Sequence, residues 1–304
     1  MLDRRLEGVG NTFRSDSDTE VIVHLYEDEG IDCLSQLNGM FAIAIWDANR
    51  RRLLLGRDRL GQKPLVYRHE PGRVAFASEL KSLLEIPGIS RQIDAGAIDE
   101  YLTYQYVPHP NTIFQGLRKL PPGHRAVFED DTFDVQPYWA PDLNHEIQIS
   151  VDDATVQLRS LMDDAVQMRM RSDVPLGAFL SGGVDSSLIV ALMQRASEQP
   201  IKTFSIGFPI AAYDETAYAR QVAEHLGTEH HEFQVTPEAI EILPKLVWHY
   251  DEPFADSSAI PTWYVSQMTR EKVTVALSGD GGDELFAGYP RYRAIWLKIG
   301  RAHV

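Results

Sequence analysis

Residues 174–187 read V-P-L-G-A-F-L-S-G-G-V-D-S-S, and this stretch decides the fold. The run 175–180 is short and apolar, as is typical of a buried parallel strand. A glycine turn at 181–183 follows it, and from Ser186 onward apolar side chains recur at helical spacing. Such a turn predicts an anion site, because glycines let a phosphate approach the backbone and the N–H groups at a helix start favour negative charge. The alternative is an ordinary strand-to-helix turn with a serine cap.

The second half of the chain alternates helices with strands. Repeated β–α units predict an α/β fold with a parallel, doubly wound sheet and right-handed crossovers. Ligands bind beyond the carboxyl ends of such strands, so we expect the turn at 181–183, Gly207 and a second glycine turn at 278–282 to meet in one crevice. The expected helices span 153–171, 186–196, 216–226, 237–250 and 259–269, and the expected strands span 175–180, 202–207, 231–235 and 273–277.

Two motifs carry a resemblance to known families. S-G-G-V-D-S-S, 181–187, resembles the pyrophosphate loop of the PP-loop ATP-pyrophosphatase superfamily, whereas no Walker loop occurs in the sequence. S-G-D-G-G-D-E-L-F-A-G-Y, 278–289, is similar to the second nucleotide motif of the glutamine-hydrolysing asparagine synthetases. The resemblance covers nearly the whole chain and implies ATP and Mg²⁺ as ligands.

The resemblance also assigns roles to residues of both motifs. Asp185 and Asp283 would hold Mg²⁺, which prefers hard oxygen ligands, and Asp280 would serve the acyl-adenylate step. The alternative for Asp280 and Asp283 is a solvated turn with a side-chain-to-backbone bond. Phosphates would bind Ser181, Gly182, Gly183, Ser186 and Ser187, and the adenosine part would contact Phe179, Leu180, Ile206, Ser278 and Gly279.

The first half predicts an α+β domain. We expect strands over 41–46, 52–56, 65–67 and 74–77 in one meander, a hairpin over 125–128 and 132–135, and helices over 18–29, 79–84 and 99–106. The segments 17–20, 37–47, 57–64 and 76–81 look like the glutaminase domain of the same family, which implies a partial N-terminal-nucleophile amidotransferase αββα sandwich. Asp18 would then bind the amino group of glutamine, although Asp18 or Thr19 also suits a helix cap.

The sequence departs from that family at its start. The glutaminase nucleophile is an N-terminal cysteine, whereas this chain begins Met1-Leu2 and its one cysteine, Cys33, lies between apolar residues. We therefore expect Cys33 to be a packed small residue and this polypeptide not to hydrolyse glutamine.

We expect residues 1–145 to be an amidotransferase domain lacking its N-terminal third, and 146–304 a PP-loop domain truncated at its C-terminus. The tail 299–304, I-G-R-A-H-V, does not resemble the family and could be translated sequencing adapter. The hypothesis would be rejected by genomic reads in which I-G-R-A-H-V is present and the open reading frame continues beyond it with sequence that resembles the family.

Composition bounds the partners. The chain has 304 residues and a formal net charge of −15, which disfavours nucleic acid and anionic membranes. One cysteine permits no internal disulfide, and the chain has no apolar run of membrane-spanning length and no signal peptide, so we expect a cytoplasmic protein. Aspartate, glutamine and ATP are the implied small-molecule partners, and a homodimer stays open.

Three functions remain in view. The first is glutamine-dependent asparagine synthesis, in which ATP adenylates the aspartate β-carboxylate with loss of pyrophosphate and ammonia displaces AMP. The second is a related amidotransferase that acts on another carboxylate, and the third is an inactive nucleotide-binding fragment. The segments 251–253 and 256–258 look like the family loop near the acceptor carboxylate, although a helix cap explains 256–258 equally well.

Overall fold

The computed structural model describes residues 5–6, 8, 11–15, 17–144, 146–209, 214–235, 239–292 and 294–295. It divides into two compact units. Unit 1 comprises Met1–Glu146 together with Val247–Asp256, and unit 2 comprises Ile147–Leu246 and Ser257–Val304. The tail whose origin is in question, 299–304, lies outside the described residues.

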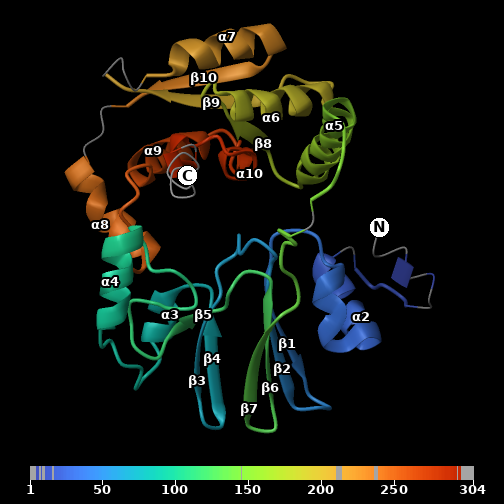
Figure 1. Ribbon diagram of the computed structural model, residues 1–304, viewed down its shortest axis with the longest axis vertical. Coiled ribbons are helices and arrows are strands. Elements are labelled where there is room, and N and C mark those ends of the chain that lie inside the picture. Colours follow the sequence, from blue (N-terminus) through green and yellow to red (C-terminus); the bar gives the residue numbers. More distant parts are fainter. Residues whose placement is uncertain are drawn as a thin grey trace, which may run out of the picture. The chain divides into compact units, whose positions relative to one another are not determined.

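Unit 1 contains two antiparallel sheets (Figure 1). The first has the order β1 (Ala42–Asp47), β2 (Arg52–Arg57), β6 (His124–Glu129), β7 (Thr132–Pro137). The second has the order β4 (Arg73–Ala77), β3 (Val66–Glu70), β5 (Arg118–Lys119). The expected single meander is therefore wrong, although each of its strands exists. The cause is the loop after β2, where the buried Asp58 carboxylate accepts the backbone N–H groups of Leu60, Gln62 and Lys63 and so fixes the turn between the two sheets.

The layers of unit 1 follow from its apolar clusters. The two sheets share one cluster, which includes Leu55 of β2 and Tyr67 of β3. Helix α2 (Asp18–Glu29) and the 3₁₀ helix η1 (Gly30–Gln36) cover the first sheet, and α3 (Leu80–Leu84) packs on the second. Helix α4 (Ala95–Tyr104) packs on Val107 and Ile113. Unit 1 thus has the order helix, sheet, sheet, helix.

Unit 2 is built on a parallel sheet, as expected. Its order is β10 (Glu229–Gln234), β9 (Lys202–Gly207), β8 (Leu176–Phe179), β11 (Val275–Leu277). Helices α5 (Val151–Arg169), α6 (Val184–Arg195) and α7 (Thr216–Leu226) share one core with β8. Helix α9 (Ala259–Thr269) lies on the opposite side of the sheet from α7 (Figure 1). The remaining helices are α8 (Ala239–Tyr250) and α10 (Gly282–Phe286).

Two helices of unit 1 are capped at an earlier residue than expected, because the capping side chain precedes the first residue of the apolar pattern. The cap of α2 is Ser17, which accepts the N–H of Thr19 at 3.2 Å, and not Asp18 or Thr19. Helix α4 starts at Ala95 and not at Asp99, because the Asp94 carboxylate accepts the N–H of Gly96 at 2.8 Å.

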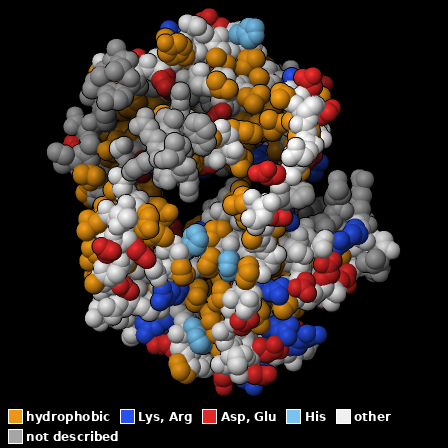
Figure 2. Space-filling model, in the orientation of Figure 1, with side chains coloured by type: hydrophobic (Ala, Val, Ile, Leu, Met, Phe, Trp, Pro, Cys, Tyr) orange, Lys and Arg blue, Asp and Glu red, His pale blue; other side chains and the backbone are white. Residues whose placement is uncertain are grey.

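The surface carries charge of both signs. On the face shown in Figure 2, acidic and basic side chains are interspersed over unit 1. The net charge of −15 is therefore not a single acidic field on that face. None of the described helices is long and apolar enough to cross a membrane.

Candidate nucleotide site

The first glycine turn is held by its own hydroxyls. Strand β8 ends at Phe179, and α6 begins at Val184 with Gly183 as its cap. Ser186 Oγ lies 3.0 Å from Ser181 Oγ and accepts the N–H of Ser181 at 3.3 Å, and Ser181 Oγ in turn accepts the N–H of Gly183 at 3.3 Å. These bonds close the loop on itself and leave the start of α6 facing the space beyond the strand.

Gly182 is required by packing. Its φ is +81°, and a Cβ atom there would lie 2.7 Å from the amide nitrogen of Ala219 in α7. A side chain at 182 would therefore push the turn away from α7. Gly182 does not line the pocket described below, so its predicted phosphate contact gains no support from the geometry.

The second glycine turn meets the first because their strands are neighbours. Strand β11 pairs in parallel with β8, and Leu277 stands opposite Ala178. Both strands therefore end at the same edge of the sheet. A Cβ atom at Gly279 would lie 2.7 Å from the amide nitrogen of Ser186, and one at Gly282 would overlap the Asp185 carboxylate. The two turns are in contact although about a hundred residues separate them in the sequence.

A polar pocket of about 530 Å³ opens where the turns meet. It carries three carboxylates, those of Asp185, Asp280 and Asp283, and within the described part of the chain no Lys or Arg lines it. The Asp280 carboxylate accepts the Ser278 hydroxyl at 2.8 Å. The lining residues are Phe179, Ser181, Gly183, Val184, Asp185, Ser186, Thr262, Val265, Ser278, Gly279, Asp280 and Asp283.

An apolar pocket of about 260 Å³ adjoins the polar one. The two pockets share Phe179, Ser181, Thr262 and Val265, so they form one continuous depression. Its size and aromatic walls suit a planar base. Its lining residues are Phe179, Leu180, Ser181, Phe204, Ser205, Ile206, Phe208, Glu215, Pro261, Thr262 and Val265.

Most of the predicted nucleotide residues therefore gather in one place. Ser187 is an exception, since it lines neither pocket, and its Oγ is buried without a hydrogen-bond partner among the described residues. One wall was not predicted from the sequence; it is supplied by Pro261, Thr262 and Val265 of α9. No glycine or charge marks these residues. The usable signal was that a doubly wound sheet carries helices on both faces.

The second turn is steadied by Glu284 and Tyr289. The Tyr289 hydroxyl donates to Glu284 at 2.7 Å, and the N–H of Gly281 donates to the same carboxylate at 3.1 Å. The bond between the two side chains lowers the pKa of Glu284 and raises the pKa of Tyr289 to about 12. Both groups hold the start of α10, which carries Asp283 into the polar pocket.

Comparison with known proteins gives a consistent result. The asparagine synthase family profile matches residues 157–303, and the glutamine amidotransferase domain profile matches residues 1–139. The chain is 40% identical to asparagine synthetase [glutamine-hydrolyzing] 1 of Bacillus subtilis over 294 residues. The match covers 96% of this chain and 46% of that protein. The chain belongs to the asparagine synthetase family.

Two further relatives show the breadth of the match. A putative asparagine synthetase [glutamine-hydrolyzing] 2 of Methanocaldococcus jannaschii is 40% identical over 278 residues, which are 90% of this chain and 54% of that protein. Amidase chyE of Penicillium rubens is 31% identical over 303 residues, which are 93% of this chain and 44% of that protein. The chain thus spans about half the length of the curated relatives it matches.

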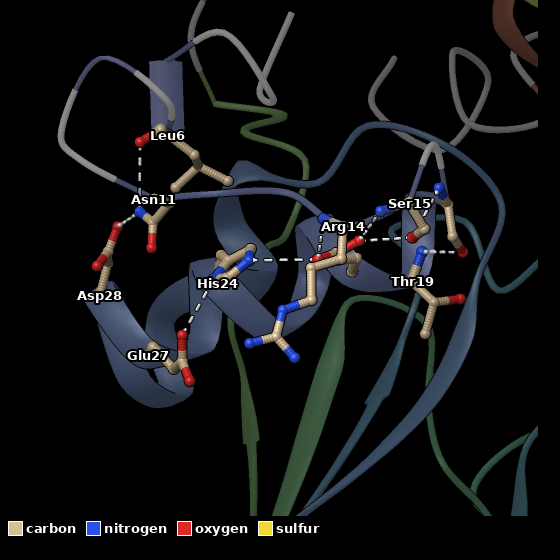
Figure 3. Close-up of polar contacts among 10 residues, drawn as sticks. Leu6, Asn11, Arg14, Ser15, Thr19, His24, Glu27 and Asp28 are labelled. Carbon is tan, nitrogen blue, oxygen red and sulfur yellow. Dashed lines mark hydrogen bonds and ion pairs between the residues drawn. The ribbon is translucent and has the colours of Figure 1, made fainter.

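Asp18, the expected glutamine ligand in this family, lies in the first turn of α2. It is exposed, and its carboxylate accepts the Thr19 hydroxyl at 3.4 Å. Its neighbour Glu20 accepts the N–H groups of Arg14 and Ser15, both at 2.8 Å, and thereby holds the preceding loop against the helix (Figure 3). The carboxylate of Glu20 is thus occupied by the loop, whereas the carboxylate of Asp18 is exposed at the start of the helix.

Cys33 is a packed residue, as expected. It is fully buried in η1 among Leu25, Leu34 and Leu54. Burial raises the pKa of its thiol to about 11, so it is not a reactive thiolate near neutral pH.

The segment 251–253, which resembles the family loop near the acceptor carboxylate, has ion-pair partners of its own. It belongs to unit 1, where Asp251 is paired with Lys81 and Glu252 with Lys119. Both carboxylates are therefore already neutralised by side chains of unit 1.

Proposed function

We propose that this protein is a glutamine-dependent asparagine synthetase whose ATP site is the joined polar and apolar pocket of unit 2. The observation that carries the proposal is the contact between the two glycine turns, which bring Ser181 and Ser278 to one pocket. Family membership supports the same function. Because the chain spans about half of its relatives, the activity of the whole protein is part of this proposal.

In this proposal the base of ATP enters the apolar pocket and the phosphates enter the polar pocket. Phe179 borders both, so the ribose would lie beside it. The N–H groups at the start of α6 and the hydroxyls of Ser181 and Ser186 would bind phosphate oxygens. Ser187 is assigned to the phosphates from the family resemblance alone, because its buried hydroxyl lines neither pocket.

The charge of the polar pocket fits Mg²⁺. Three carboxylates facing a triphosphate repel it unless a cation lies between them. The described residues contain no group of three or more His, Cys, Asp or Glu arranged to hold a metal. Mg²⁺ commonly binds through one or two carboxylates and substrate phosphates, and Asp185 and Asp283 are placed for that role. When bound, Mg²⁺ would neutralise phosphate charge.

The reaction then follows from position and charge. The β-carboxylate of aspartate attacks the α-phosphorus of ATP. The bond between the α-phosphorus and the oxygen that joins it to the β-phosphorus breaks, and pyrophosphate leaves with that oxygen. Ammonia attacks the acyl carbon of β-aspartyl-AMP, loses a proton and displaces AMP to leave asparagine. Asp280, oriented by Ser278, is the residue we assign to the first step. Asp18 of unit 1 is assigned to glutamine.

The test is ATP–pyrophosphate exchange with a panel of acids. Exchange that requires aspartate supports the proposal, whereas exchange only with another carboxylic acid would show the related amidotransferase. The likeness to an amidase keeps that second candidate in view. ATP binding without exchange under any acid would indicate a nucleotide-binding fragment.

A further inference from the structure

Helix α9 presents different stripes to α8 and to the nucleotide pocket, and all of these contacts lie within unit 2. Four residues of α9 pack in one apolar cluster with Ile242 and Leu246 of α8: Ala259, Ile260, Trp263 and Tyr264. Thr262 and Val265 are three residues apart, so they share another stripe of the helix, and both line the polar and the apolar pocket. The packing on α8 therefore holds Thr262 against the pocket.

Thr262 lies at the junction of the two pockets. The residues that line both are Phe179, Ser181, Thr262 and Val265. In the proposed binding mode the base occupies the apolar pocket and the phosphates occupy the polar pocket. A residue that borders both therefore faces the part of the nucleotide that joins them, which is the ribose.

The hydroxyl of Thr262 is the one at this junction that the protein does not use. Phe179 and Val265 have no polar side-chain atom, and Ser181 Oγ takes part in the bonds that close the first glycine turn. The N–H of Thr262 donates to the carbonyl of Ser258 at 3.0 Å, but its hydroxyl makes no hydrogen bond to any residue that the structure describes. A threonine in a helix often bonds the carbonyl four residues earlier. Without that bond, the Thr262 hydroxyl can both donate to and accept from a ligand.

We propose that Thr262 is a specificity-determining residue: its hydroxyl binds the ribose hydroxyls and makes the site prefer a ribonucleotide. The inference rests on the proposed ATP site and on residues of unit 2 alone. A sugar hydroxyl donates and accepts hydrogen bonds as the threonine does, so the two groups are complementary. A nucleotide that lacks both ribose hydroxyls would leave the Thr262 hydroxyl without this partner.

The experiment compares the affinities of the full chain for ATP and for dideoxy-ATP, which lacks both ribose hydroxyls, by calorimetry in Mg²⁺. The wild type should bind ATP about three- to tenfold more tightly, as expected for one neutral hydrogen bond. Thr262→Val has nearly the same shape without the hydroxyl. It should bind ATP more weakly by the same factor and bind dideoxy-ATP as the wild type does. Thr262→Ser keeps a hydroxyl and should keep the preference for ATP.

Thr269→Val is the matched control in the same helix. The Thr269 hydroxyl is buried, has no hydrogen-bond partner in the described part of the chain, and lines neither pocket. This variant should keep the wild-type preference for ATP. Because Thr262 is exposed, Thr262→Val should fold as the wild type does, and the comparison of the two nucleotides on the wild type needs no variant.

The outcomes separate the two proposals. A wild-type chain that binds neither nucleotide overturns the ATP site and this inference with it. If the wild type binds both nucleotides equally well, the ATP site stands and the ribose contact is wrong. The ribose contact is also wrong if Thr262→Val keeps the full preference for ATP, or if it weakens both nucleotides equally. A preference lost to the same extent in Thr269→Val would show a general effect on α9 and would contradict the role of Thr262.

Discussion

Gly279 packs directly on Ser186: a Cβ atom at position 279 would lie 2.7 Å from the Ser186 amide nitrogen. The second glycine turn is therefore seated on the first turn of α6. This contact explains how two short motifs far apart in the sequence can act on one ligand. It exists because β11 and β8 are neighbouring parallel strands that end at the same edge.

The contact predicts that Gly279→Ala separates the two turns. The two atoms nearest to the added methyl group would be the Ser186 amide nitrogen and the Asp185 carbonyl carbon. Both belong to the backbone, so the backbone itself would have to move. We expect at least a tenfold loss of ATP affinity, equivalent to about 1.4 kcal/mol, in a calorimetric titration. Gly8→Ala is the control, because a Cβ atom at Gly8 meets no atom within 4 Å. Unchanged affinity in Gly279→Ala would mean that the two turns do not act together.

The carboxylates of the polar pocket predict metal-dependent ATP binding. Chelation of Mg²⁺ should weaken ATP binding by the wild-type chain, and Asp283→Asn should bind ATP weakly with or without Mg²⁺. Without Mg²⁺ the Asp283 carboxylate of the wild type repels phosphate, and Asp283→Asn removes an anionic Mg²⁺ ligand, so added Mg²⁺ restores less affinity to the variant. Titrations in Mg²⁺ and in EDTA measure the effect. Asp164→Asn, at an exposed position of α5 in the same unit, does not line the pocket and should keep the full Mg²⁺ dependence. Equal Mg²⁺ dependence in Asp283→Asn would exclude that carboxylate as a ligand.

The apolar pocket predicts where the base binds. Ile206→Trp, at a residue that lines only the apolar pocket, should fill much of the 260 Å³ depression and abolish measurable AMP binding, while pyrophosphate should still bind in the polar pocket. Competition titrations with AMP and with pyrophosphate distinguish the two effects. Val156→Trp, at a 68% exposed site on α5, is the control and should leave both affinities unchanged. Retained AMP affinity in Ile206→Trp would place the base elsewhere.

Cys33 gives the pH prediction. Burial raises its pKa from 9.0 to about 11, so at pH 8 about one thousandth of the folded thiol is ionised. Iodoacetamide should therefore modify the native chain far more slowly than the urea-unfolded chain. Since the unfolded thiol ionises first, the stability that Cys33 contributes is complete below pH 9 and declines as the pH rises toward 11. Urea unfolding of the wild type and of Cys33→Ala across this range should show a steeper decline in the wild type, since the tyrosines with raised pKa values contribute the same decline to both chains. Rapid native alkylation at pH 8 would contradict the packed role.

Local sequence patterns predicted the parallel half of the fold well. The helix over 216–226 and the strand over 202–207 have the expected bounds, because a glycine ends each pattern: Gly227 follows the helix and Gly207 closes the strand. The same logic placed Ser181 and Ser278 at strand ends, where the structure brings them together.

Long-range contacts were beyond those patterns. Nothing in D-E-P shows that Asp251 and Glu252 would be bound by lysines more than a hundred residues earlier in the chain. The wall formed by Thr262 and Val265 was missed for a similar reason, since an apolar helix face looks the same whether it faces a core or a ligand. The split of the strands of unit 1 into two sheets depends on the buried Asp58 loop, whose backbone bonds leave no periodic signal.

The central claim is that the two glycine turns bind one nucleotide. A crystal structure of the chain with a non-hydrolysable ATP analogue and Mg²⁺ tests it most directly. We expect the phosphates to contact both the 181–187 turn and the 278–283 turn, with the metal on Asp185 and Asp283. A nucleotide that contacts only one of the turns, or that binds outside the joined pocket, would contradict the claim.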